Sequence, residues 1–309
     1  MTEVFQIIDG TKEFHGVKAI TNVNFSLFKG EIHSLLGENG AGKSTMTKVA
    51  AGVYQLSSGS FVFEGKETTF LNPSEALKNG VVMVFQENSL VPNMTVSQNI
   101  YLGAENFFNS LAKLNIKASR FLQSLNFNVD PNLLVSQLGA AQKQMVEIAR
   151  AVHHNAKVII FDEPTATLTP EEKHHFFGLM QRLKKEGVSI VFISHALEEA
   201  LEHSDRITVL RDGELIETDK AKNFNRERIV KAMIGRDLTD SAYASKKTAR
   251  KKPRKRGKKT LEVENLSMGS MVKNSTFSAY SGQITGVFGL VGSGRTEMMK
   301  VVSGVYKRN

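Results

Sequence analysis

The sequence predicts an α/β fold built on a mostly parallel β-sheet. Short segments at 158–161 and 189–193, apolar at every position except Ser189, are typical of strands that are buried on both faces of such a sheet. A segment with helical periodicity, 138–152, precedes them, and strands that alternate with helices favour parallel pairing. A glycine-rich loop also joins a predicted strand at 31–36 to a predicted helix at 43–51.

This glycine-rich loop has the composition of a phosphate-binding loop, or P-loop. Its glycines allow backbone N–H groups to turn towards a phosphate, and the following helix presents its positive end to the same anion. Lys43 is expected to reach the β- and γ-phosphates of ATP, and Ser44 to bind Mg²⁺. The residues expected to contact the nucleotide are Gly37, Glu38, Asn39, Gly40, Ala41, Gly42, Lys43, Ser44 and Thr45.

Two adjacent carboxylates, Asp162 and Glu163, follow the apolar strand 158–161. A carboxylate at the end of a buried strand is costly to place without a partner, and Mg²⁺ would supply one for Asp162. Glu163 is then placed to polarise the attacking water as a general base. The alternative is an exposed pair in the turn before Pro164, but the P-loop upstream favours the catalytic interpretation.

The composition indicates a globular protein with one basic segment. The 309 residues include 41% hydrophobic and 23% charged side chains and no cysteine, which excludes disulfides and thiolate metal sites. The formal net charge is +9, but the ten basic residues between Lys246 and Lys259 leave −1 for the rest of the chain. We therefore expect a disordered basic linker at 244–259 and no specific nucleic-acid partner, with contact to anionic lipid as the alternative role of the linker.

An internal repeat organises the chain. Residues 25–54 and 277–306 align without a gap at an offset of 252, with the glycines in register. The repeat predicts one full module, a linker and the beginning of a second copy. We expect domains at 1–243 and 260–309, and we expect the second copy to continue beyond Asn309. We also predict a buried strand at 81–85, which ends next to Gln86.

These motifs, in this order, resemble those of the ABC ATPases. In that family a glutamine at a strand end links Mg²⁺ and water to the transmembrane partner, and Gln86 matches its position. His195 matches the histidine that contacts the γ-phosphate, and Phe14 matches the aromatic residue that stacks on adenine. The resemblance thus implies Lys43, Glu163 and His195 as catalytic residues; it implies Ser44, Gln86 and Asp162 as residues of the Mg²⁺ site. It also implies an antiparallel β subdomain and a helical subdomain at about 87–150.

The sequence is most similar to double-cassette ATPases of bacterial monosaccharide importers of the ribose, galactose and xylose type. Residues 14–19, 144–151 and 289–297 carry this similarity. It implies a peripheral ATP-binding subunit at the cytoplasmic face of the membrane, which couples ATP hydrolysis to sugar import. The implied partners are a transmembrane permease, a second cassette from the same longer chain or a homodimer, and indirectly a periplasmic-type sugar-binding protein. No apolar stretch of the sequence approaches the roughly 18 residues that a membrane span needs.

Two motifs depart from the family's pattern. The signature Leu-Ser-Gly-Gly-Gln reads Leu-Gly-Ala-Ala-Gln at 138–142, so Gly139 replaces the serine and Ala141 replaces a glycine. In the second loop, Arg295 stands in place of the P-loop lysine. In this family each site combines a P-loop from one cassette with a signature from the other, so the two altered motifs would face each other. We expect one competent site, one impaired site, and weak hydrolysis by this chain alone.

Two other functions fit part of the sequence. ABC ATPases of the translation-factor branch also have paired cassettes and a basic linker, although theirs is longer and helical; salt-sensitive binding to ribosomes or RNA would support that class. The second alternative is a cassette that binds ATP with little hydrolysis.

Overall fold

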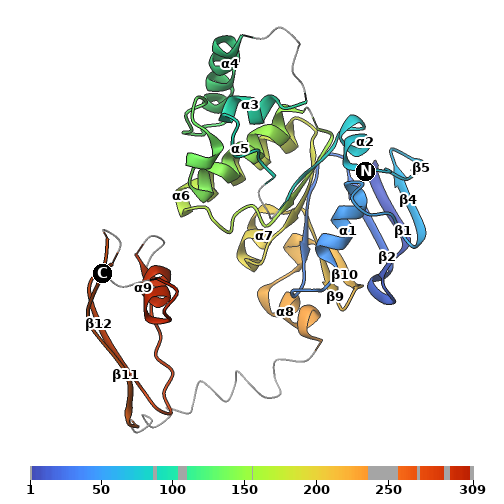
Figure 1. Ribbon diagram of the computed structural model, residues 1–309. Helices are drawn as coiled ribbons and strands as arrows, with labels where there is room; N and C mark the ends of the chain where they lie inside the picture. The colour runs from blue at the N-terminus through green and yellow to red at the C-terminus, as the bar shows by residue number, and fades with distance from the viewer. Residues whose placement is uncertain are drawn as a thin grey trace. The chain divides into compact units, whose positions relative to one another are not determined.

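The computed structural model divides the chain into two compact units, Met1–Asp237 and Leu238–Asn309 (Figure 1). The predicted boundary at 243/244 and most of the predicted basic linker lie outside the described residues, so they stay predictions. The structure describes residues 2–85, 89–103, 110–154, 156–235, 257–269, 272–288 and 293–306.

A six-stranded sheet forms the centre of the first unit, in the order β10-β9-β3-β8-β7-β6. Five neighbouring strands run parallel, and only β10 runs antiparallel to its neighbour β9. Every residue of β3, β7 and β8 is buried, which confirms the predicted parallel sheet with both faces covered. The strands are β3 (Ile32–Leu36), β6 (Val81–Val84), β7 (Val158–Asp162), β8 (Ser189–Ile193), β9 (Arg206–Arg211) and β10 (Glu214–Lys220).

A second, antiparallel sheet has the order β2-β1-β4-β5. Its strands are β1 (Glu3–Phe14), β2 (Val17–Phe28), β4 (Ser58–Phe63) and β5 (Lys66–Thr68). The Phe5 ring lies 5.6 Å from the rings of both Phe25 and Phe61, so aromatic contacts join three strands of this sheet. The same hydrophobic cluster includes Leu35 of the central sheet and Met46, so this layer packs against the face that also holds the first helix.

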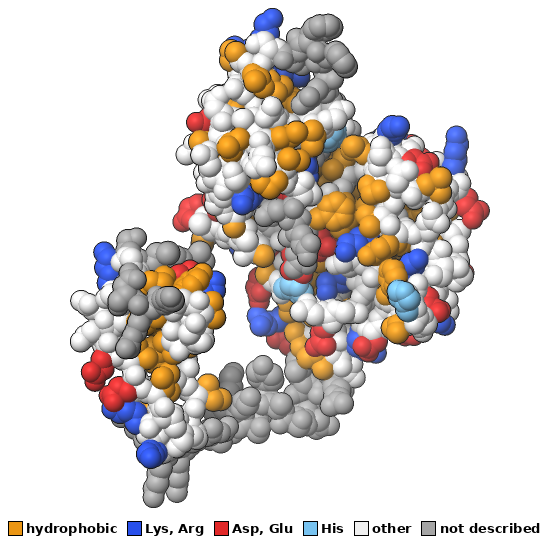
Figure 2. Space-filling view, viewed as in Figure 1, with side chains coloured by type: hydrophobic (Ala, Val, Ile, Leu, Met, Phe, Trp, Pro, Cys, Tyr) orange, Lys and Arg blue, Asp and Glu red, His pale blue; other side chains and the backbone are white. Residues whose placement is uncertain are grey.

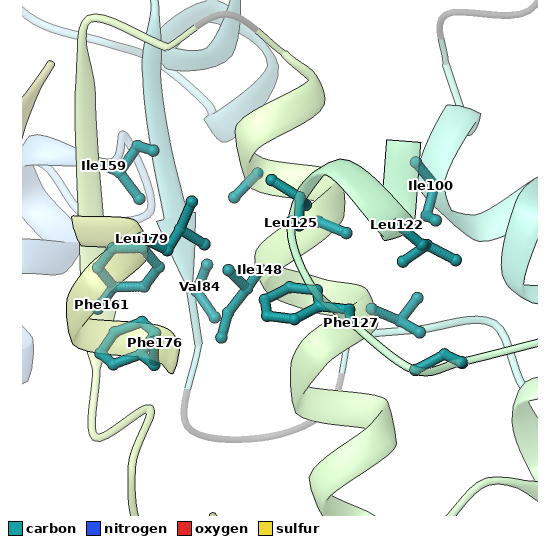
Figure 3. Packing of buried hydrophobic residues seen from close by; sticks show 14 of the residues in the cluster. Val84, Ile100, Leu122, Leu125, Phe127, Ile148, Ile159, Phe161, Phe176 and Leu179 are labelled. Atoms are coloured by element: carbon teal, nitrogen blue, oxygen red, sulfur yellow. The ribbon is translucent and has the colours of Figure 1, made fainter. Parts of the chain in front are cut away.

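Helices cover the central sheet. They are α1 (Lys43–Ala50), α2 (Pro73–Lys78), α6 (Pro170–Lys185), α7 (Leu197–His203) and α8 (Arg226–Ile234), with a 3-10 turn at Ala221–Asn223. Helix α6 begins with a capping box in which Thr169 and Glu172 exchange hydrogen bonds, and Pro170 occupies its first turn. Its buried face meets the sheet where the Phe161 and Phe176 rings lie 5.1 Å apart (Figure 3).

A helical region stands apart from the antiparallel sheet (Figure 1). It contains α3 (Val96–Tyr101), α4 (Leu111–Ser124), a 3-10 turn at Val135–Gln137 and α5 (Ala140–His153). The same hydrophobic cluster runs from these helices to β7 and α6, and Figure 3 shows Ile148 of α5 between Phe127 and the sheet side of the cluster. Helix α5 begins two residues later than predicted, because Gly139 has the extended backbone of an N-cap, with φ −69° and ψ 167°.

The second unit contains an antiparallel hairpin, β11 (Lys259–Met268) and β12 (Val272–Tyr280), and helix α9 (Arg295–Val302). The residue bounds of α9 lie at the repeat offset of 252 from those of α1. The segment between hairpin and helix differs sharply from its counterpart: Ile284 is 93% and Phe288 is 96% exposed, whereas Ile32 and Leu36 at the matched positions of β3 are fully buried. Among the described residues of both units, no helix is long and apolar enough to cross a membrane.

Candidate functional site

The glycine-rich loop connects β3 to α1 at the carboxyl edge of the central sheet. Gly42 caps α1 with a left-handed backbone, φ 99°, and a Cβ there would meet the Ala19 carbonyl oxygen and Ile20 Cγ2, each at 2.7 Å. A Cβ at Gly37 would meet the Leu210 carbonyl oxygen at 2.4 Å. Close packing by β2 and β9 therefore requires glycine at both ends of the loop.

The Lys43 side chain lies folded over the loop. It is 6% exposed, and its Nζ donates to the carbonyl oxygens of Gly37 and Glu38, both at 2.9 Å. Burial lowers the pKa of Lys43, while the nearby carboxylates of Glu163 and Asp162 act in the opposite direction. A cation is thus held at the start of a helix whose free N–H groups already favour an anion.

Asp162 ends strand β7 and is 3% exposed. Burial raises its pKa, a hydrogen bond with the Ser44 side chain lowers it, and the neighbouring Glu163 raises it again. Its Oδ1 is buried and has no hydrogen-bond partner among the described residues. A buried carboxylate oxygen without a hydrogen-bond partner, next to a serine hydroxyl, fits a Mg²⁺ site, because Mg²⁺ binds few protein oxygens and keeps several waters.

Glu163 and His195 form a contact between the ends of two adjacent strands. His195 Nε2 lies 2.5 Å from Glu163 Oε1, and the backbone N–H of Glu163 donates to the Ile193 carbonyl at 3.1 Å. Glu163 has a left-handed backbone, φ 52°, which is unusual for a non-glycine residue and is typical of functional loops. The backbone of Glu163 is therefore bonded to the end of β8, two residues before His195.

One cavity of about 510 Å³ brings most of the predicted site together. Its lining consists of Ala19, Asn39, Gly40, Ala41, Gly42, Lys43, Ser44, Thr45, Glu163 and His195. Phe14 does not line it; the Phe14 ring packs edge-on against Tyr54, 4.9 Å away, at the end of β1. Gln86 lies outside the described residues. The roles of these site residues stay predictions.

The altered signature lies at the start of α5. Gly139 donates its N–H to the Gln142 side chain at 3.2 Å, and Gly139 and Ala140 are exposed. A Cβ at Gly139 would meet only Gln142 Oε1, at 4.0 Å, so a serine would fit this backbone. In the second unit, Arg295 and Glu297 lie in the first turn of α9, while residues 289–292 are outside the described part of the chain.

Sequence reasoning missed Glu199, which contacts the two loops that carry Glu163 and His195. It accepts hydrogen bonds from Thr165 and Ser194, two residues after Glu163 and one before His195 respectively. Its sequence signal was weak, since Glu199 is one of three acidic residues in α7.

In the comparison with protein families, residues 20–166 match the family described as ABC transporter. Among curated proteins, the chain is 41% identical over 309 residues to a xylose import ATP-binding protein of Thermoanaerobacter pseudethanolicus, covering 96% of this chain and 60% of that protein. It is 42% identical over 302 residues to a galactose/methyl galactoside import ATP-binding protein of Clostridium perfringens, covering 96% and 57%. It is 38% identical over 313 residues to a ribose import ATP-binding protein of the same species, covering 99% and 61%. The chain therefore spans about 60% of the length of such relatives.

Solved structures show the same fold. A cassette of an ABC transporter in an ADP conformation is 28% identical, with a TM-score of 0.67, and the match covers 76% of this chain and all of that one. A nucleotide-free cassette, also 28% identical, has a TM-score of 0.64 and is covered to 96%.

Proposed function

We infer that this chain belongs to the ABC transporter family of ATP-binding cassettes, and on that basis we propose that it binds and hydrolyses ATP to drive sugar import through a membrane permease. The observation that carries the proposal is the convergence of Lys43, Ser44, Glu163 and His195 on one cavity, together with a buried Asp162 oxygen that has no hydrogen-bond partner among the described residues, on a carboxylate bonded to Ser44. A parallel sheet with both faces covered brings these loops together at one edge.

Each side chain then has a chemical role. Lys43 binds the β- and γ-phosphates, and the N–H groups at the start of α1 bind the same anion. Ser44 and Asp162 hold Mg²⁺, with Gln86 as a further ligand; when bound, the ion neutralises phosphate charge. Glu163 polarises the attacking water, and His195, 2.5 Å from its carboxylate, contacts the γ-phosphate.

We place the competent site between two cassettes. The P-loop at 37–45 pairs with a signature from a second cassette, which belongs either to the same longer chain or to a second copy. The altered signature at 138–142 pairs with the altered loop around Arg295, so this pair is impaired. The support is that the two departures fall on motifs that would meet in one site.

The partner at the membrane is a permease, with a periplasmic-type sugar-binding protein acting indirectly. All three relatives described above are sugar import ATP-binding proteins. A groove of about 230 Å³ is lined in part by Phe85, which directly precedes Gln86 in the sequence, and by Leu102 and Arg150 of the helical region. We propose this groove as the contact with the permease. This places the chain at the cytoplasmic face of the membrane as a peripheral subunit.

Phosphate release from MgATP tests the proposal. The unmodified chain should show weak hydrolysis that rises with protein concentration, because two copies must meet. Lys43→Ala should abolish binding of a fluorescent ATP analogue, and Glu163→Gln should retain binding but lose hydrolysis; Glu171→Gln, an exposed acid in the first turn of α6, is the matched control. ATP binding that survives Lys43→Ala would contradict the P-loop assignment.

A membrane arm tests the transport class. The chain should co-sediment with membranes only when a sugar permease is present in them. Association with ribosomes or RNA that weakens steeply with salt would instead indicate the translation-factor class.

A further inference from the structure

The carboxylate of Glu199 collects hydrogen bonds from three segments of the chain. Its Oε2 accepts from Thr165 Oγ1 and from Ser194 Oγ, each at 2.8 Å. Its Oε1 accepts from Lys173 Nζ of α6, also at 2.8 Å. Glu199 lies in the first turn of α7, so its carboxylate connects this short helix to two loops and to helix α6.

The two loops are those that carry the proposed water-activating and γ-phosphate residues. Thr165 follows Glu163 by two positions, and Ser194 directly precedes His195. Thr165 and Ser194 are each 4% exposed, so their hydroxyls are removed from water and depend on protein partners. Oε2 is therefore a buried acceptor shared by the two loops that carry Glu163 and His195.

The charge of this carboxylate is maintained in its buried position. Its side chain is 12% exposed, and burial acts to raise the pKa of Glu199. The hydrogen bonds from Lys173, Ser194 and Thr165 outweigh burial and lower the pKa below its usual value. Glu199 thus remains an anion at neutral pH, and hydrogen bonds to an anion are stronger than neutral ones.

We propose that Glu199 is a positioning residue for ATP hydrolysis, whose Oε2 ties the loop of Glu163 to the loop of His195 and holds these two side chains in register. The inference rests on the proposed ATPase function. Glu199 does not line the nucleotide cavity, so it acts through the two loops and not on the nucleotide itself. Residues that act in this way affect the chemical step more than ground-state binding.

A second contact makes the test selective. The Glu163 N–H also donates to the Ile193 carbonyl, so the strand ends stay joined when the Glu199 carboxylate is removed. Loss of the Glu199 carboxylate should therefore change the orientation of the Glu163 and His195 side chains, while the P-loop and its phosphate contacts remain intact. A residue needed only for folding would instead lower stability, ATP affinity and turnover together.

The experiment compares variants of the full chain in steady-state ATP hydrolysis. Glu199→Ala should lower kcat about 10- to 100-fold, and leave KM for MgATP within about twofold, as expected for a misplaced catalytic group. Glu199→Gln should recover most of the rate, because its amide oxygen can accept from both hydroxyls. Lys173→Met removes only the bond to Oε1 and should have a small effect.

The matched control is Glu198→Ala. Glu198 is the preceding residue of the same helix, is 64% exposed, and pairs with Arg226 at the surface. This variant should hydrolyse ATP at the unmodified rate. An unchanged kcat in Glu199→Ala would overturn the proposal, as would parallel losses of kcat, ATP affinity and melting temperature.

Hydrogen exchange without nucleotide gives an independent measurement. The Ala196 N–H, which donates to Ser194 Oγ at 3.0 Å, and the amides of 165–168 should exchange faster in Glu199→Ala and not in Glu198→Ala. Equal protection in the two variants would refute the bridge. If the unmodified chain neither bound nor hydrolysed ATP, the proposed function would fail, and exchange alone would then decide whether Glu199 joins the two loops.

Discussion

Replacing Asp162 by asparagine tests whether this carboxylate is placed to bind a cation or is an ordinary buried acid. Asp162 is 3% exposed, its Oδ1 has no hydrogen-bond partner among the described residues, and Glu163 adds a second negative charge beside it. Asparagine keeps the shape and an oxygen for the Ser44 hydroxyl but removes the charge. We therefore expect Asp162→Asn to be more stable than the unmodified chain when no nucleotide or metal is present.

The size of the gain follows from burial. An unsatisfied buried polar group costs about 1–3 kcal/mol and more when charged, so removing the charge should return about 1–2 kcal/mol. For a unit of 237 residues this raises the melting temperature by about 2–8 °C. The pKa of Asp162 is raised from an ordinary value of 3.8, so its charged form is disfavoured in the folded state. The advantage of asparagine should therefore shrink as pH falls through the folded pKa of Asp162.

Thermal unfolding with and without MgATP checks the prediction. At a free ligand concentration of about 100 Kd, MgATP should stabilise the unmodified chain by about 2.7 kcal/mol, and Asp162→Asn should lose most of this gain. The control is Asp205→Asn. Asp205 accepts from the Ile32 N–H at 2.8 Å and pairs with Lys184, so its replacement should destabilise the chain by about 1 kcal/mol. The reasoning is refuted if Asp162→Asn is less stable without ligand, or if it gains as much from MgATP as the unmodified chain.

Three further variants test other parts of the structure. Gly42→Ala should lower stability by about 1–3 kcal/mol more than Gly40→Ala, because both backbones are left-handed but only a Cβ at 42 meets the Ala19 carbonyl, at 2.7 Å; chemical unfolding measures the difference. Gly139→Ser should fold normally and raise the melting temperature slightly, because the backbone at 139 has room for a side chain. It should also increase concentration-dependent ATP hydrolysis; an unchanged rate would contradict the assignment of 138–142 as the signature. Burial lowers the pKa of His33, so the folded state resists its protonation and stability should fall as pH drops below 6.5 towards the folded pKa; His33→Gln should flatten this dependence in melts from pH 7 to 5.

The central sheet could be predicted because its signals are local. The strand predicted at 189–193 has the observed bounds, and that at 158–161 extends by one residue, because buried parallel strands consist almost entirely of apolar residues. The glycine-rich loop between β3 and α1 was equally predictable, because its glycines lie in a short local pattern between an apolar strand and a helix.

What the sequence could not show are contacts between distant segments. Glu199 receives bonds from residues at 165, 173 and 194, and no local period records that set. The late start of α5 depends on the extended backbone of Gly139, which a hydrophobic pattern beginning at Leu138 does not reveal. Phe14 stands at the position that the family resemblance assigns to adenine stacking, but its ring packs against Tyr54. Its role at adenine stays a prediction.

The exposure of Ile284 and Phe288 has a practical consequence for handling the protein. An extended apolar segment at the surface is prone to self-association, so concentrated samples of the full chain should aggregate more readily than the first unit would suggest. The hydrophobic clusters formed by the described residues lie in the first unit, and α8 closes with a left-handed C-cap at Gly235. A shorter chain that ends at Gly235 should therefore be the more soluble sample for crystallisation and titration with nucleotide, while it retains every residue of the cavity.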